Sequence, residues 1–117
     1  MRTIIAGSRN ITDINVVREA VKKSKFSITE VVSGCAKGVD RLGEEIAKEL
    51  GLPIKRFPAK WDEYGKRAGF LRNEEMAEYA DALIAVWDGK SKGTKHMINL
   101  AAKNGLYLFV LKLDGIK

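Results

Sequence analysis

The sequence predicts an α/β domain of three layers, in which a five-stranded parallel sheet lies between two layers of helices. Three observations support this fold class. Apolar runs alternate strictly with segments of helical periodicity, most of the runs are nearly continuous, and the connections between elements are short. Continuous runs are typical of strands buried on both faces, and strict alternation is typical of βαβ units. The length of 117 residues favours one domain, which we expect to span residues 1–117.

Five apolar runs are the candidate strands, and they cover residues 2–7, 28–34, 53–58, 81–87 and 106–112. Four of them are nearly continuous and rich in β-branched or aromatic residues, which predicts buried parallel strands. The run PIKRFP at 53–58 alternates between apolar and polar residues instead. Alternation indicates a strand with one solvated face, so we expect this run at an edge of the sheet.

The first two helices are predicted from apolar residues at helical spacing. The stripe of the first consists of Val17, Ala20, Val21 and Ser24, and either Thr12 or Asp13 is suited to cap its N-terminus. The second helix ends at Gly51. Its stripe contains Val39, Leu42, Gly43, Ile46, Ala47 and Leu50.

Two further helices follow, over residues 67–80 and from about Gly93 to Asn104. Between the third strand and the third helix lies one long connection, residues 59–66. Five strands and four helices in this alternation predict a doubly wound, Rossmann-like domain. Two strand orders compete at this point, 3-2-1-4-5 and 2-1-3-4-5, which place the switch point between strands one and four or between strands one and three.

Composition narrows the class of protein. The chain has one cysteine, Cys35, and one histidine, His96, so we expect no disulfide framework and no metal site. No apolar run approaches the roughly 20 residues of a membrane span, and the apolar part of the N-terminus is too short for a signal peptide. We therefore expect a cytoplasmic protein with no membrane association. The net charge of +6 favours a negatively charged partner.

Three loops that follow strands carry glycine together with at least one cation. Ligands of open parallel sheets bind beyond the carboxyl ends of the strands, and helix N-termini there attract anions. We therefore expect one anion-binding pocket formed by residues of these loops. The candidate ligand-binding residues are Gly7, Ser8 and Arg9 after strand one, Gly34, Lys37, Gly38 and Asp40 after strand two, and Ser91, Gly93 and Thr94 after strand four.

Neither standard phosphate motif is present in the chain. A P-loop has four residues between its first glycine and its Gly-Lys-Ser/Thr, whereas Gly89 and Gly93 enclose only three. In addition, Gly93 is followed by Thr94 and then a lysine, which reverses the order of the motif. No G-x-G-x-x-G occurs either. The sequence thus argues against an ordinary P-loop NTPase and against a standard NAD-binding Rossmann domain.

The third helix adds two further candidates. Asn73 falls on its apolar stripe and Arg72 on the flank of that stripe. A buried amide needs partners, so Asn73 either bonds to the connection at 59–66 or points with Arg72 at the ligand. Trp61 in that connection either stacks on a base or covers the edge of the sheet. The residues alone leave both alternatives open.

These pieces together resemble the SLOG superfamily, the Rossmann-like group that contains the Lonely Guy phosphoribohydrolases and the DNA-processing protein A family. Within it, the chain is similar to the small stand-alone branch related to YpsA and YspA. The matching segments are GSR, SGCAKGVDRLGEEIAKELG, FPAKWDEYGKRAGFLRNEEM and SKGTKHMINLA. The resemblance implies a nucleotide-type ligand held by the loops after strands one and four, and it favours the strand order 3-2-1-4-5.

The chain departs from the Lonely Guy pattern at one position that matters for chemistry. Gly93 and Thr94 match that pattern, but the glutamate that serves in N-glycosidic cleavage is replaced by Met97, and DGKSKG replaces the proline-diglycine loop. A thioether neither donates nor accepts a proton. Phosphoribohydrolase activity is therefore not expected from the resemblance alone.

Three hypotheses about function follow. The first is a sensor or ligand-binding domain for a nucleotide or nucleotide-derived molecule such as ADP-ribose or NAD, without a resident cofactor. The alternative is a hydrolase of an N-glycosidic or phosphate bond, and the third is single-stranded nucleic-acid binding, which steep salt dependence would reveal. Homodimerisation is also expected, because the third helix carries Phe70, Leu71 and Tyr79 beyond the needs of one core face and the family often pairs through its helices.

Overall fold

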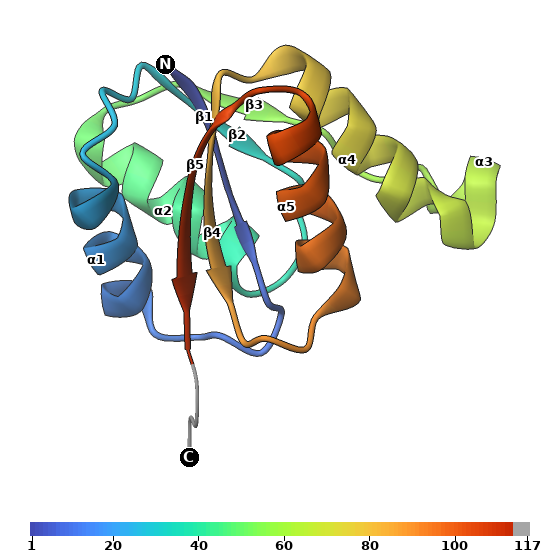
Figure 1. Ribbon diagram of the computed structural model, residues 1–117, viewed down its shortest axis with the longest axis horizontal. Coiled ribbons are helices and arrows are strands. Elements are labelled where there is room, and N and C mark those ends of the chain that lie inside the picture. Colours follow the sequence, from blue (N-terminus) through green and yellow to red (C-terminus); the bar gives the residue numbers. More distant parts are fainter. Residues whose placement is uncertain (114–117) are drawn as a thin grey trace.

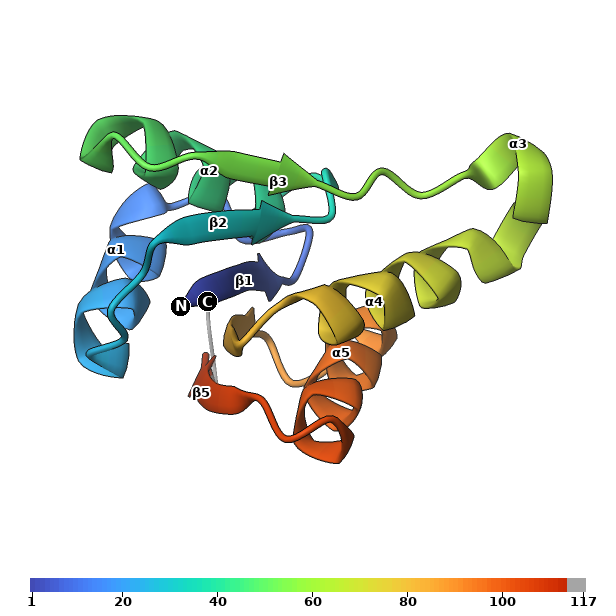
Figure 2. The same ribbon diagram turned by 90° about the horizontal axis from the view of Figure 1, so that it is seen from above.

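A computed structural model describes residues 1–113 and contains one sheet of five parallel strands in the order β3-β2-β1-β4-β5. The sheet lies between two layers of helices (Figures 1 and 2). The strands are β1 (Arg2–Gly7), β2 (Glu30–Ser33), β3 (Ile54–Arg56), β4 (Ala82–Trp87) and β5 (Tyr107–Lys112). The order 3-2-1-4-5 is thus confirmed, and the alternative order 2-1-3-4-5 is wrong.

Strand β1 is the centre of the sheet because it pairs with a neighbour on each side. Thr3 lies opposite Val31 of β2 and opposite Ala82 of β4, both in parallel register. The pairing with β4 continues to Gly7 and Val86 at the carboxyl end. Since the chain leaves β1 and β4 toward opposite faces, their carboxyl ends form the switch point where ligands of such sheets bind.

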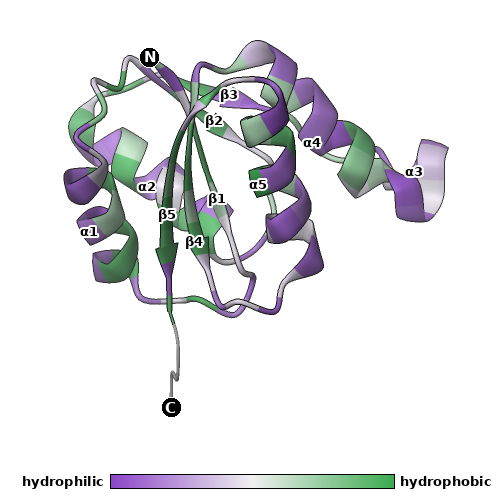
Figure 3. Cartoon of the chain, viewed as in Figure 1, coloured by the Kyte–Doolittle hydropathy of each residue, from purple (hydrophilic) through white to green (hydrophobic). Residues whose placement is uncertain are grey.

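The helices are α1 (Ile14–Ser24), α2 (Val39–Leu50), α4 (Ala68–Tyr79) and α5 (Lys92–Lys103). Helices α1 and α2 cover one face of the sheet, and α4 and α5 cover the other (Figure 1). Apolar residues line the strands and the inner faces of the helices, while the outer faces are hydrophilic (Figure 3). Burial of these apolar stripes against the sheet is what stabilises helices of this length.

Helix ends follow the local chemistry of the sequence. Asp13, rather than Thr12, caps α1, and its carboxylate accepts a 2.9 Å hydrogen bond from the Asn15 amide. Gly51 ends α2 in the left-handed conformation, with φ of 69°. Ser91 caps α5, which begins at Lys92, one residue before the predicted start near Gly93.

The connection at residues 59–66 is not a simple loop. It contains a short helix, α3 (Trp61–Tyr64), and most of a 3₁₀ turn, η1 (Gly65–Arg67). Together with the first turns of α4 this segment extends beyond the sheet like an arm (Figure 2). The sequence did not indicate this helix because four residues are too few for helical periodicity.

Strand β3 is an edge strand, as its alternation predicts, but the prediction that β5 is buried is wrong. Tyr107 is 63% exposed and Leu108 is 38% exposed. Strand β5 is the second edge of the sheet, and α1 and α5 cover its faces only in part. An apolar run therefore did not distinguish a central strand from an edge strand.

Tyr79 is also less available than expected for a surface contact. Its ring packs on Phe57 with a centroid distance of 5.5 Å, and the Arg2 guanidinium lies 4.7 Å from its centroid. Its hydroxyl donates to the Glu30 carboxylate. Phe70, by contrast, is 48% exposed even though its ring edge meets His96.

Within residues 1–113, no helix combines the length and the apolar character that crossing a membrane requires.

Candidate functional site

A small hollow lies at the carboxyl edge of the sheet, where the loops after β1, β2 and β4 meet α4. We call it the polar pocket, and its volume is about 80 Å³. Most of the candidate ligand-binding residues line it, together with Ala6, Ala36, Met76 and Met97. The candidates are Gly7, Arg9, Asp40, Arg72, Asn73, Ser91, Gly93 and Thr94. The structure therefore brings eight of the twelve candidates to one place.

Ser8 connects the loop after β1 to the end of β4 and the loop after it by two hydrogen bonds. This residue is buried, its amide donates to the Val86 carbonyl at 3.1 Å, and its hydroxyl accepts from the Asp88 amide at 3.0 Å. These bonds fix the β1 loop to the β4 loop. Ser8 thus positions the pocket from behind and does not line it.

The loop after β4 arranges the N-terminus of α5. One oxygen of Asp88 accepts from the amides of Lys90 at 2.8 Å and Ser91 at 2.9 Å, and these bonds lower the pKa of Asp88. The Ser91 hydroxyl oxygen then accepts from the Thr94 amide at 3.3 Å and the Thr94 hydroxyl at 3.0 Å. Since this oxygen accepts both bonds, its own hydrogen is left to donate to a ligand.

The first amides of α5 add to this donor set. A helix leaves its first N–H groups without intrahelical partners, and its N-terminus carries partial positive charge. Gly93 sits at this point, and a Cβ built on it would meet nothing within 4 Å. The backbone there is open to an approaching group.

Asp40 contributes a buried carboxyl group from the first turn of α2. It is 5% exposed, and it accepts a 3.3 Å hydrogen bond from the Ala36 amide. Burial raises its pKa from 3.8 to about 6, against the attraction of Arg72 and the backbone amides. A carboxyl group in this environment changes protonation close to neutral pH.

The raised pKa of Asp40 predicts a specific pH dependence of stability. Because the folded state binds the proton more tightly than the unfolded state, ionisation of Asp40 lowers the free energy of unfolding as pH rises from about 4 to about 6. The cost at neutral pH is about 3 kcal/mol. In urea titrations, the Asp40→Asn variant should gain about this much relative to wild type across that range.

The comparison between variant and wild type isolates this effect. Carboxyl groups with lowered pKa, such as Asp81 and Glu44, act in the opposite direction in both proteins and cancel in the difference. An asparagine accepts fewer backbone bonds than a carboxylate, but that loss does not vary with pH. Parallel stability curves for the two proteins would contradict the prediction.

Arg72 and Asn73 connect the β2 loop, α4 and α5 by hydrogen bonds. The Arg72 guanidinium donates to the Gly34 carbonyl and, at 3.0 Å, to the Asn73 side-chain oxygen. The Asn73 amide group lies 3.3 Å from the Gly93 carbonyl and 3.1 Å from His96 Nδ1. Asn73 is therefore satisfied by Arg72 and α5, and its partners do not lie in the connection at 59–66.

A second hollow of about 250 Å³ adjoins the polar pocket, and we call it the outer hollow. The two share Arg9, Ala36 and Arg72. Trp61 lines the outer hollow, is 50% exposed, and packs its ring edge toward Gly69. Helix α3 lies beyond the carboxyl end of β3 (Figure 2).

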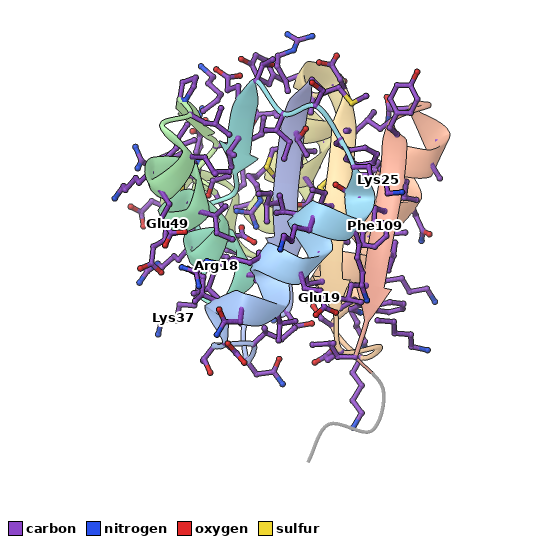
Figure 4. All side chains as sticks on the ribbon, turned by 90° about the vertical axis from the view of Figure 1, so that its left-hand side faces the viewer. Arg18, Glu19, Lys25, Lys37, Glu49 and Phe109 are labelled. Carbon is purple, nitrogen blue, oxygen red and sulfur yellow. The ribbon has the colours of Figure 1, made fainter. Side chains whose placement is uncertain are left out.

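Four candidates do not line the polar pocket: Ser8, Gly34, Lys37 and Gly38. Gly34 borders the outer hollow instead. Gly38 has φ of 77°, and a Cβ on it would lie 2.5 Å from the Ser8 carbonyl, so it allows two loops to pack together. The Lys37 side chain is exposed and reaches outward from the turn before α2 (Figure 4).

Four residues of the outer hollow are absent from the candidates of the sequence analysis, and two of them, Pro58 and Ala59, come from a strand whose loop was not considered. They follow β3, so the rule that ligands bind after the carboxyl ends of strands would have identified them had it been applied to the third strand as well. Cys35 also borders this hollow, and burial raises the pKa of its thiol. Within residues 1–113, no cluster of three or more His, Cys, Asp or Glu side chains is placed to hold a metal.

Comparison with known proteins shows which family this chain resembles. The model of the YAcAr family, described as the YspA, cpYpsA-related SLOG family, matches residues 1–64. The Gene 61 protein of Mycobacterium phage D29 is 34% identical over 115 residues, which cover 90% of this chain and 91% of that protein.

A second relative is much longer than this chain. The histone-lysine N-methyltransferase Set8 of Drosophila pseudoobscura pseudoobscura is 27% identical over 108 residues, covering 91% of this chain but 14% of that protein. No solved structure matches the chain.

Proposed function

The chain belongs to the YspA, cpYpsA-related SLOG family, and from that premise we propose that it binds a phosphorylated nucleoside or a derivative such as ADP-ribose or NAD. The phosphate lies in the polar pocket, and the base or second ribose lies in the outer hollow beside Trp61. In this proposal the protein holds the ligand as a sensor or binding domain and does not cleave it.

The observation that carries the proposal is that two guanidinium groups, Arg9 and Arg72, line both hollows. Burial lowers the pKa of Arg72 despite the opposing attraction of Asp40, and the like charge of Arg9 lowers it further. Two cations held close together are stabilised by an anion between them. The open N-terminus of α5 faces the same pocket, so backbone amides and side chains favour the same kind of group.

The dimensions of the two hollows support a ligand with a small polar end and a larger flat end. The polar pocket, at about 80 Å³, is much smaller than the outer hollow, at about 250 Å³, so it suits a small group such as one phosphate. The outer hollow, at 250 Å³, is open and offers the Trp61 ring for stacking. Arg9 and Arg72 stand at their junction.

Met97 supports binding without cleavage. It stands at the position of the Lonely Guy glutamate, is 1% exposed, and lines the polar pocket with a thioether that cannot act as an acid or a base. Hydrolysis is the second candidate because Asp40, with a pKa of about 6, lines the same pocket. Release of free base or phosphate by wild type, and its loss in Asp40→Asn, would favour that candidate.

A thermal-shift screen against nucleotides, ADP-ribose and NAD tests the proposal. A ligand at about 100 times its dissociation constant adds about 2.7 kcal/mol to the stability of the folded state. We expect Gly93→Val to abolish the shift without lowering the melting temperature of the free protein, because Gly93 lines the pocket and a Cβ built on it meets no protein atom within 4 Å.

Asn99→Val is the matched control, since it places the same side chain on an exposed position of α5 outside the pocket. It should leave the ligand shift unchanged. If every ligand fails to shift wild type, or if Gly93→Val responds like wild type, the proposed pocket is wrong. Binding of oligonucleotides with a steep salt dependence would instead support the nucleic-acid hypothesis.

A further inference from the structure

We propose that His96 and Asn73 are positioning residues for Arg72, and that they hold its guanidinium group at the polar pocket only while the His96 ring is neutral. The three side chains form one line of hydrogen bonds, from the half-buried ring on α5, through α4, to the loop after β2. Helices α4 and α5 lie side by side on the same face of the sheet (Figures 1 and 2). The consequence for binding rests on the proposed function, since it assigns Arg72 to the phosphate.

The direction of each hydrogen bond in this line is fixed by the chemistry of the groups. A guanidinium group has donors only, so the Asn73 atom that lies 3.0 Å from Arg72 Nε is the side-chain oxygen. The Asn73 nitrogen then faces α5, where it lies 3.3 Å from the Gly93 carbonyl and 3.1 Å from His96 Nδ1. Because an amide nitrogen only donates, Nδ1 has to accept. The His96 ring is therefore neutral and carries its proton on Nε2.

A second proton on His96 is incompatible with this line. The Nδ1–H group would face the donor group of Asn73, so the amide would have to turn its oxygen toward the ring. Its nitrogen would then face Arg72 Nε, where two donors meet, and the Gly93 carbonyl would lose its partner. Asn73 is 6% exposed, so water has little access to replace these bonds. Arg72 would keep its bond to the Gly34 carbonyl but lose the one at Nε.

An aromatic contact fixes the orientation of the His96 ring. The Phe70 ring meets it edge to face, with a centroid distance of 4.6 Å and an interplanar angle of 71°. Phe70 precedes Asn73 by three positions, so one face of α4 presents both the ring that packs on His96 and the amide that bonds to it. This contact gives Phe70, which lies outside the apolar core, a role beside the site.

The surroundings of His96 determine the pH at which the line breaks. Burial lowers the pKa of His96, and the Glu74 carboxylate on α4 acts in the opposite direction. On α5 itself, Lys92 lies one turn before the ring and Lys95 beside it, while the strands behind α5 contribute apolar residues. Arg72 is the cation at the other end of the line. Because the pKa is lowered, the ring is neutral at physiological pH and becomes charged in mild acid.

NMR of the free protein tests the line of hydrogen bonds without a ligand. His96 is the one histidine of the chain, so its ring nitrogen signals are unambiguous. At neutral pH we expect Nδ1 without a proton and Nε2 with one. Nitrogen relaxation should show a rigid Arg72 Nε at neutral pH and a mobile one once His96 is protonated. In His96→Asn, the amide oxygen can accept from Asn73 and does not titrate, so Arg72 should stay rigid in acid.

ADP-ribose is the probe for binding, because its diphosphate lacks the terminal phosphate group that ionises near about pH 6. In titration calorimetry, acidification should weaken binding to wild type about tenfold more than binding to His96→Asn, which is the effect of one hydrogen bond. Asp40 also titrates in this range, but it is present in both proteins and cancels in the difference.

Two further variants separate the acceptor from the shape of the ring. His96→Phe keeps a ring but has no acceptor, so it should bind ADP-ribose about tenfold more weakly than wild type at neutral pH, and His96→Asn should restore most of this loss. Asn99→Ala changes an exposed amide on the same helix and should follow wild type at every pH.

The role of His96 and the proposed function can fail separately. A proton on Nδ1 at neutral pH, or an Arg72 side chain whose mobility does not follow the protonation of His96, overturns the inference. Equal pH dependence of binding in wild type and His96→Asn also overturns it. If wild type binds no ADP-ribose, the proposed function fails for this ligand, and the NMR result still decides the role of His96.

Discussion

Gly7→Ala is expected to destabilise the fold by about 3 kcal/mol, at the upper end of what overpacking costs in a close-packed interior. A Cβ at this position would lie 2.0 Å from the Val86 carbonyl oxygen and 2.8 Å from Cγ2 of Val39. The carbonyl belongs to the neighbouring strand, so relief requires that β1 and β4 separate at the switch point. Urea denaturation followed by circular dichroism measures the loss.

Two other glycines provide the controls. Gly43→Ala should also destabilise, but by less than Gly7→Ala, because its Cβ would lie 2.8 Å from Cβ and Cγ2 of Ile5 whereas the contact at Gly7 is 2.0 Å. Gly93→Ala should be neutral or slightly stabilising, since its surroundings are open and alanine favours a helix. An unchanged denaturation midpoint for Gly7→Ala would show that the strands separate at little cost.

Gly7 also illustrates how much of the structure can be predicted from the sequence. Gly7 is a candidate in the sequence analysis because it follows a strand, and the sheet order was narrowed to two by alternation alone. Choosing 3-2-1-4-5 depended on the resemblance to the SLOG superfamily, because nothing local in the chain specifies which strand lies beside β1. Sheet order results from packing between distant segments, which local patterns do not record.

Side-chain direction was the main limit for the site. Lys37 and Arg9 are both cations in glycine-containing loops after strands, yet Arg9 lines both hollows and Lys37 reaches into solvent. Gly38, with φ of 77°, sets the direction of the loop after β2, and this loop packs against the backbone of Ser8 and Arg9. Sequence spacing identified the loops but not the orientation of each side chain in them.

The α3 segment was missed for a related reason. Trp61 was expected either to stack on a base or to cover the sheet edge, and both alternatives assumed an irregular connection. The structure instead contains a short helix there, and Trp61 at its start lines the outer hollow. The tip of the Trp61 ring lies near Gly69 of α4, and no pattern in the sequence indicates this contact between two elements.

Arg9→Ala is expected to weaken the binding of a phosphorylated nucleoside about tenfold to hundredfold, which corresponds to the loss of roughly 1.5–3 kcal/mol for a hydrogen bond to a charged group. Arg9 lines the polar pocket and the outer hollow, and its exposed side chain is not needed by the core. The folded state should therefore keep its melting temperature in the absence of ligand. Isothermal titration calorimetry with a ligand identified by the thermal-shift screen measures the change in affinity.

Two further substitutions decide whether the guanidinium group or mere positive charge is responsible. Arg9→Lys should recover only part of the affinity, because an ammonium group cannot hold a phosphate by two parallel hydrogen bonds. Lys37→Ala removes the same net charge as Arg9→Ala from a side chain outside the polar pocket, so it should leave the dissociation constant nearly unchanged. If Lys37→Ala weakens binding as much as Arg9→Ala does, the ligand responds to the overall charge of the protein, and Arg9 makes no direct contact with it.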